Sequence, residues 1–326
     1  MVSTGFAPSA DRARQLDAEV SRQLGLSLRH VLCASKDQLA FDGEALDALC
    51  THLEAGGRVR PAVFGAYYDT VVAIGDDDLE EASRQLARLA RWTPFGAREV
   101  VAYGSPDLAE DNALYHAKWD HAVSPLRAPS TAVASGFRTR LDDGFALMQT
   151  ALPELYGEID AILRQVVVIG KEPAAPMHVD GGSHYQLWGA LFLNGEFHPD
   201  RIAVVEVLAH ETAHCLLFGF CTEEPLVLNG DDELHPSPLR HDLRPMDGLY
   251  HATFVSARMH WAMTRLAEHS GLSEDERGRA REAAAKDADN FEKGYGVVAT
   301  HGKLTERGAA LMEGARSTMA EAKVAA

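Results

Sequence analysis

The chain has 326 residues, and its 48 acidic residues outnumber its 31 lysines and arginines, which leaves a formal net charge of −17. This length exceeds the usual size of a single hydrophobic core, so we expect two domains or one large domain with a helical extension. The negative charge argues against a nucleic acid as partner. We find no secretory signal and no run of about 18 apolar residues, and the four cysteines form no CxxC pair. These features predict a cytoplasmic protein without a membrane partner.

Apolar residues recur at helical spacing through most of the first 128 residues. The pattern predicts helices over residues 11–26, 42–53, 61–75, 78–92 and 107–121. One short strand is expected at 99–103. A loop that contains Pro125 and Pro129 follows, and we place a domain boundary there. The prediction is therefore a helical N-terminal region at 1–128 and a catalytic domain at 129–326.

The second part of the chain mixes strand and helix patterns. In chain order, the patterns predict a helix at 130–163, strands at 165–170 and 186–193, a helix through 204–218, a polar loop at 219–245, and helices at 248–270, 273–297 and 304–325. We therefore expect a mostly helical α+β fold. In it, a small sheet and a metal-binding helix form the catalytic domain.

The most informative stretch is an HExxH sequence, His210-Glu211-Thr212-Ala213-His214, inside an apolar run. Residues four apart lie on one face of a helix, with Cβ atoms about 5–6 Å apart, so both imidazoles can bind one metal ion. Apolar neighbours on nearly every side predict a buried helix, in which the histidines need a partner. A shared metal ion would satisfy them. The alternative is a pair of core histidines that are hydrogen-bonded to protein groups.

A third ligand would define the class of the metal site. The extended HExxHxxGxxH protease pattern is excluded, because Leu217 and Phe220 stand where it needs glycine and histidine. We expect His251, at the start of an apolar helix, to complete the site. Two alternatives remain, namely no third protein ligand or an acid among Glu223, Glu224, Glu233 and Asp247. Three histidines suit zinc hydrolysis and iron(II) oxygen chemistry equally well.

Two arginines precede His251 in the same connection, at Arg240 and Arg244. A guanidinium forms a two-pronged contact with a carboxylate, and a metal beside an arginine is a layout that binds a 2-oxo acid. The alternative is that these arginines pair with nearby acids at the surface. The candidate acids are Asp231, Asp232, Asp242 and Asp247.

A longer pattern links these residues to a known family. The segment Ser237-Pro-Leu-Arg-x-Asp-x-Arg-Pro-x-x-Gly-x-x-His251 follows the HExxH motif and a Gly-Ser element with Trp188-Gly189. Over about residues 165–260, the chain resembles the HExxH modification proteins of bacterial ribosomal-peptide biosynthetic clusters. Members of this family are also described as 2-oxoglutarate-dependent HExxH peptide β-hydroxylases.

The resemblance implies that His210, His214 and His251 hold Fe(II). It also implies that Arg240 or Arg244, together with Ser183, binds 2-oxoglutarate, and that the substrate is a precursor peptide hydroxylated at a β-carbon. The peptide would lie along the Gly182–Ser183 edge and the 220–245 loop. The acidic surface would suit a basic leader.

The role of Glu211 separates the remaining alternatives. In the hydroxylase it orients ligands or substrate. In a zinc metallopeptidase it is the general base that activates water. A further alternative is a non-catalytic peptide-binding protein whose histidines are structural. The sequence predicts no oligomeric state.

Overall fold

The computed structural model describes residues 4–119, 125–172, 179–237 and 242–325. It is a mostly helical α+β fold, as predicted, and it divides into two units. Unit 1 comprises Met1–Ala13, Thr139–Ile159 and His198–Ala326, and unit 2 comprises Arg14–Arg138 and Asp160–Phe197. This division by internal contacts does not test whether residues 1–128 and 129–326 fold separately, so that boundary stays a prediction.

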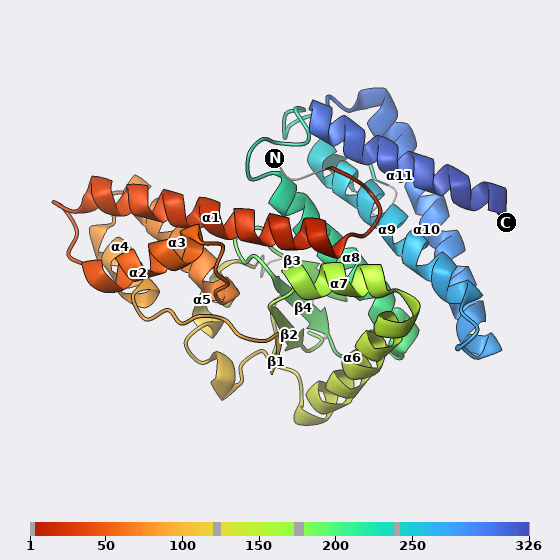
Figure 1. The fold of residues 1–326 in the computed structure, drawn as a ribbon, viewed down its shortest axis with the longest axis horizontal. Helices are drawn as coiled ribbons and strands as arrows, with labels where there is room; N and C mark the ends of the chain where they lie inside the picture. The colour runs from red at the N-terminus through yellow and green to blue at the C-terminus, as the bar shows by residue number, and fades with distance from the viewer. Residues whose placement is uncertain (1–3, 120–124, 173–178, 238–241, 326) are drawn as a thin grey trace. The chain divides into compact units, whose positions relative to one another are not determined.

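Unit 2 contains a four-stranded sheet in the order β1-β2-β4-β3 (Figure 1). The strands are β1 (Glu99–Ala102), β2 (Gln165–Ile169), β3 (Gly181–Ser183) and β4 (Ala190–Asn194). Strands β1, β2 and β4 are parallel, and β3 is antiparallel to β4. Every residue of β2 and β4 is buried, as expected for parallel strands covered on both faces.

Strand β4 is shorter than the strand predicted at 186–193, because it starts only at Ala190. Gly189 has a φ of +80°, a left-handed conformation that cannot continue an extended strand and that suits glycine. A Cβ at this position would also lie 2.8 Å from the Ile162 carbonyl oxygen. The chain therefore turns at Gly189 before it enters the sheet.

The helices of unit 2 precede or flank these strands. They are the greater part of α1 (Ala10–Ser35), α2 (Gly43–Glu54), α3 (Pro61–Gly75), α4 (Leu79–Leu89), the short 3₁₀ helix η1 (Pro106–Leu108) and α5 (Asn112–Ala117). Asp42 and Asp78 cap α2 and α4, since their side chains accept hydrogen bonds from the backbone three residues later. The helices predicted in the first 128 residues are thus present, although the last of them is much shorter than expected.

A single helix was predicted over 130–163, but the structure has two, α6 (Thr131–Ala151) and α7 (Pro153–Ile162). Pro153 explains the break, because proline lacks a backbone N–H and restricts the residue before it. Both helices contribute residues to both units.

Unit 1 is built mainly from four long helices: α8 (Arg201–Phe220), α9 (Met246–Glu268), α10 (Glu274–His301) and α11 (Glu306–Ala325). Helix α9 packs against each of the other three (Figure 1). By length and composition α8 is apolar enough to cross a membrane, yet 72% of its apolar window is buried inside the protein. A core helix of a soluble protein has the same properties, so the burial of α8 is consistent with a soluble protein.

The segment predicted as a polar loop at 219–245 contains a two-stranded antiparallel ladder instead. Its strands are β5 (Leu234–Pro236) and β6 (Leu243–Pro245), and β6 leads directly into α9. The two strands carry matching triplets, Leu-His-Pro and Leu-Arg-Pro. Because these triplets lie in polar surroundings, their alternation gave no recognisable strand signal.

Candidate metal centre

Helix α8 carries the HExxH motif in its second half. The helix begins at Asp200, whose carboxylate accepts hydrogen bonds from the backbone N–H groups of Ile202 and Ala203, at 2.9 and 3.2 Å. This N-cap and the apolar residues around the motif explain why the segment forms a buried helix. The helix therefore holds His210 and His214 one turn apart on a fixed scaffold.

The two motif histidines face each other through their Nε2 atoms, which are 3.2 Å apart. Two nitrogens that each lie about 2.0–2.1 Å from a tetrahedral ion are separated by about 3.3 Å. The observed separation thus fits a pair of ligands to one ion, and it fits equally well the alternative of a hydrogen bond between the two rings. Burial lowers the pKa of His214 well below its usual value, and the neighbouring His210 and His251 lower it further. The neutral form that binds metal is therefore the stable one.

His251 lies on the other side of His214. It is buried in the second turn of α9, and its Nδ1 is 3.0 Å from Nδ1 of His214, with the two rings stacked. If Nε2 of His214 presents its lone pair toward His210, the proton of His214 is on Nδ1 and can be donated to His251. Metal-bound histidines commonly make such a second contact, which fixes the tautomer and the ring orientation.

The three imidazoles are thus brought together, but not around one point. Within the described ranges, no group of three histidine, cysteine or acidic side chains converges as a set of metal ligands. The geometry fits a two-histidine site, with His251 against the outer nitrogen of His214. His251 as a third ligand stays a prediction, because it requires a ring nitrogen of His251 on the His210 side.

Among the alternative acidic ligands, those of the 220–233 segment contact cations. Arg307 lies 2.7 Å from Glu223 and 3.8 Å from Glu224. Glu233 accepts hydrogen bonds from Lys303 and Asn229, which lower its pKa to about 2. Asp247 stands in the first turn of α9, and its charge partly opposes the lowering of the pKa of His251 that burial causes.

Glu211 places a carboxylate beside the histidine pair. Its side chain is only 5% exposed, and its Oε1 lies 3.8 Å from Nε2 of His210. This is the nitrogen that faces His214, so the carboxylate lies close to the position that an ion would occupy. This position is compatible with both roles predicted for Glu211, and neither role is tested by it.

The residues predicted to bind 2-oxoglutarate are Arg240, Arg244 and Ser183. Arg240 lies outside the described residues. Arg244, in β6, forms an ion pair with Asp242, and its Nε lies 2.8 Å from the Asp242 carboxylate. This Nε forms no hydrogen bond within the described residues. This is one of the surface pairings considered as the alternative for the arginines. Ser183 belongs to unit 2, where it ends β3 opposite Leu191.

The β5–β6 ladder adds a surface that sequence reasoning missed. Leu234 pairs with Pro245, and Pro236 pairs with Leu243, so these four side chains share one face of the ladder. Leu234 and Leu243 are 49% and 55% exposed. His235 and Arg244 pair on the opposite face. An exposed apolar face at the entrance to α9 is typical of a docking surface.

No protein-family model matches this sequence, and no curated protein matches it significantly. The resemblance to HExxH peptide-modification proteins therefore depends on the motif residues alone.

Proposed function

We propose that this protein is an Fe(II)- and 2-oxoglutarate-dependent hydroxylase that acts on the β-carbon of a residue in a ribosomally made precursor peptide. The observation that carries the proposal is the buried His210–His214 pair, with Nε2 atoms 3.2 Å apart and neutral His214 favoured. The resemblance of the Arg-Pro-x-x-Gly-x-x-His segment that ends at His251 to the HExxH peptide hydroxylases favours oxygenase over hydrolase chemistry. With Fe(II) and 2-oxoglutarate bound, the oxidant would be O2: one of its oxygen atoms would enter the new C–OH group, and the other would enter succinate as 2-oxoglutarate loses CO2.

In this proposal the protein prepares the site through protonation and position. Burial keeps the imidazole of His214 neutral, so it binds the ion without first losing a proton. His251 accepts the Nδ1 proton of His214 and thereby keeps Nε2 directed toward His210. Glu211, at 3.8 Å from His210, orients that ring or the substrate.

Of the two arginines predicted to bind the co-substrate carboxylate, Arg244 lies within the described residues. To bind it, the guanidinium must exchange Asp242 for the ligand. Solvent reaches both partners, because the side chains of Arg244 and Asp242 are 36% and 61% exposed. Exposed pairs contribute at most about 1 kcal/mol. The exchange is therefore inexpensive, and a two-pronged contact with 2-oxoglutarate would offset it.

The exposed ladder face supports a peptide as substrate. Leu234 and Leu243 offer apolar contacts, and within the described residues neither β5 nor β6 pairs with a further strand. An extended peptide can add to such an edge. Asp231 and Asp232 are exposed beside it, which favours a basic peptide. All four cysteines are free, in agreement with the reducing cytoplasm that we propose as its location.

One observation favours a second candidate, a zinc metallopeptidase. Glu211 is buried next to the histidine pair, as a general base for a zinc-bound water must be. The two candidates differ in what Glu211→Gln does. It abolishes hydrolysis in a peptidase, whereas in the hydroxylase it leaves 2-oxoglutarate turnover measurable.

The deciding experiment measures succinate release from 2-oxoglutarate by anaerobically purified protein supplied with Fe(II) or Zn(II), then exposed to oxygen. We expect succinate with Fe(II) only, and its loss in His210→Ala and Arg244→Ala. The exposed His30 and the exposed, acid-paired Arg316 provide the matched controls His30→Ala and Arg316→Ala. Tightly bound zinc without succinate would select the peptidase. Absence of stoichiometric metal with peptide affinity intact would select a non-catalytic binding protein.

A further inference from the structure

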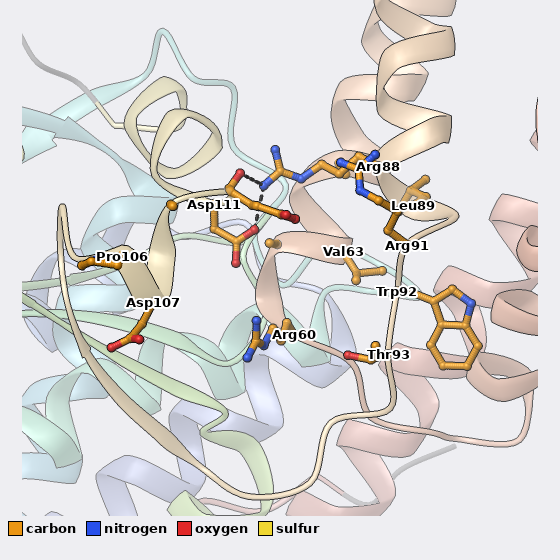
Figure 2. Close-up of a pocket in the computed structure, with 14 residues that line it drawn as sticks. Arg60, Val63, Arg88, Leu89, Arg91, Trp92, Thr93, Pro106, Asp107 and Asp111 are labelled. Atoms are coloured by element: carbon orange, nitrogen blue, oxygen red, sulfur yellow. Dashed lines mark hydrogen bonds and ion pairs between the residues drawn. The ribbon is translucent and has the colours of Figure 1, made fainter.

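Unit 2 contains a pocket far along the chain from the histidine motif. Its volume is about 380 Å³, which lies within the range of small-ligand sites. The start of α3, the end of α4, the segment 91–93 and the region of η1 line it (Figure 2). Ala62, Ala66 and Leu89 are buried and form an apolar floor.

The wall that carries Trp92 is held in place by two contacts. The indole Nε1 donates a hydrogen bond to the carbonyl oxygen of Ala45, at 3.1 Å. The indole ring also packs against His52, with centroids 4.9 Å apart. The floor is equally fixed, because α3 and α4 pack against each other. The pocket is therefore formed before any ligand arrives, which reduces the entropic cost of binding.

Two of the three arginines in the pocket already have carboxylate partners. Arg60 contacts Glu99 at 2.8 Å, and Arg88 contacts Asp111 at 2.7 Å. Figure 2 shows the second of these contacts across the upper wall. These two charges are compensated within the protein, and they leave little for a ligand to neutralise.

The remaining charges of the pocket are not compensated. Among the described residues, the guanidinium of Arg91 donates only to the carbonyl oxygen of Ala87, at 3.2 Å, and contacts no carboxylate. The carboxylates of Asp107 and Glu110, which also line the pocket, have no described partner. In Figure 2, Arg91 and Asp107 lie on opposite sides. The pocket thus offers an uncompensated cation at Arg91 and, on the opposite side, an uncompensated anion at Asp107, and Glu110 adds a second carboxylate to the lining.

This distribution selects the chemistry of the ligand. A phosphate-rich or purely acidic ligand is repelled by Asp107 and Glu110, and a purely basic one by Arg91. We propose that this pocket binds a peptide segment that bears one acidic and one basic side chain, with the acid on Arg91. The apolar floor receives the chain between them.

The proposal goes beyond the hydroxylase reaction, and its test requires neither metal nor turnover. Calorimetric titration of the full-length protein uses three end-blocked probes: acetyl-Glu-Gly-Lys-amide, acetyl-Glu-Gly-Glu-amide and acetyl-Lys-Gly-Lys-amide. Unblocked triglycine carries charges only at its amino and carboxylate termini. It tests whether the pocket recognises peptide termini rather than charged side chains. We expect the dipolar blocked peptide to bind at least about tenfold more tightly than the other three probes, since each charge-assisted contact contributes about 1.5–3 kcal/mol.

Charge reversal provides the decisive variants. Arg91→Glu should weaken binding of the dipolar peptide about tenfold and strengthen binding of the basic one. Glu110→Lys combined with Asp107→Lys should shift the preference to the acidic peptide. Lys36→Glu, an exposed reversal in the same unit and outside the pocket, should change nothing. Because all of these side chains are exposed, circular dichroism should report unchanged folding.

Three results would overturn the proposal. They are no binding of any probe, equal binding of all probes, and the same affinities in Arg91→Glu as in Lys36→Glu. Tighter binding of triglycine than of the blocked dipolar peptide would reassign the pocket to peptide termini.

Discussion

A buried charge cluster in unit 1 provides the sharpest test of how the metal helices are held. Glu158, on α7, is 1% exposed and contacts two buried arginines. Its Oε2 accepts hydrogen bonds from Arg12 and from the backbone N–H of Ser9, both at 3.0 Å, and its Oε1 accepts one from Arg258. Arg258 stands on α9, seven residues after His251, so the two lie on the same side of that helix. The cluster therefore ties α9 to the N-terminal segment.

Replacing Glu158 by glutamine preserves the shape and removes the charge. Both guanidiniums then remain buried without a counter-ion, and the new amide group presents N–H donors to N–H donors. Removing one partner of a buried ion pair costs about 3–5 kcal/mol. Because one carboxylate here serves two arginines, we expect Glu158→Gln to lower the free energy of unfolding by about 4–5 kcal/mol. This is a large part of the about 5–15 kcal/mol that stabilises a typical domain.

Urea denaturation, followed by circular dichroism and by tryptophan fluorescence, measures this change. Trp261 lies on α9 and reports on unit 1. The matched control is Glu313→Gln, which removes an exposed carboxylate paired with Arg316 and should leave the urea midpoint unchanged. If Glu158→Gln lowers the free energy of unfolding by less than about 1 kcal/mol, the reasoning is refuted. The buried arginines would then not need the Glu158 carboxylate as their counter-ion.

Three further predictions concern other sites. Burial and the nearby Glu206 raise the pKa of Asp287 to about 8, so the stability that this carboxyl contributes is full below pH 4 and is lost as pH rises toward 8. Asp287→Asn should therefore raise the melting temperature more at pH 8 than at pH 4.5, and an equal shift at both would contradict it. Asp17 accepts hydrogen bonds from Arg164 and Trp188, both at 2.7 Å. Asp17→Asn should therefore destabilise unit 2 by about 3 kcal/mol, as measured by urea denaturation. An unchanged urea midpoint would argue against the pairing. Fe(II) or Zn(II) at 100 times its dissociation constant should stabilise the wild type by about 2.7 kcal/mol but not His214→Ala, and equal thermal shifts in both would place the metal elsewhere.

The sequence by itself determined most of the helices and the position of the HExxH motif on one of them. These features depend on local physics, namely apolar spacing and caps such as Asp200 and the Ser273–Glu276 capping box, and both caps are present in the structure. The mostly helical α+β class follows from the same local patterns. The proline at 153 was also readable, but its effect on the predicted helix was overlooked.

Only the tertiary structure decided which distant segments meet. Strand β1 comes from before the predicted boundary, yet it pairs in parallel with β2 more than 60 residues later. Parallel pairing depends on non-local contacts that no local pattern encodes. Local patterns also do not encode which nitrogen of His214 contacts His251. Nor do they encode which charges around Arg91 stay uncompensated. Helical spacing places a side chain on a face, but the direction of a ring nitrogen and the pairing of a charge are set by the neighbours that folding brings.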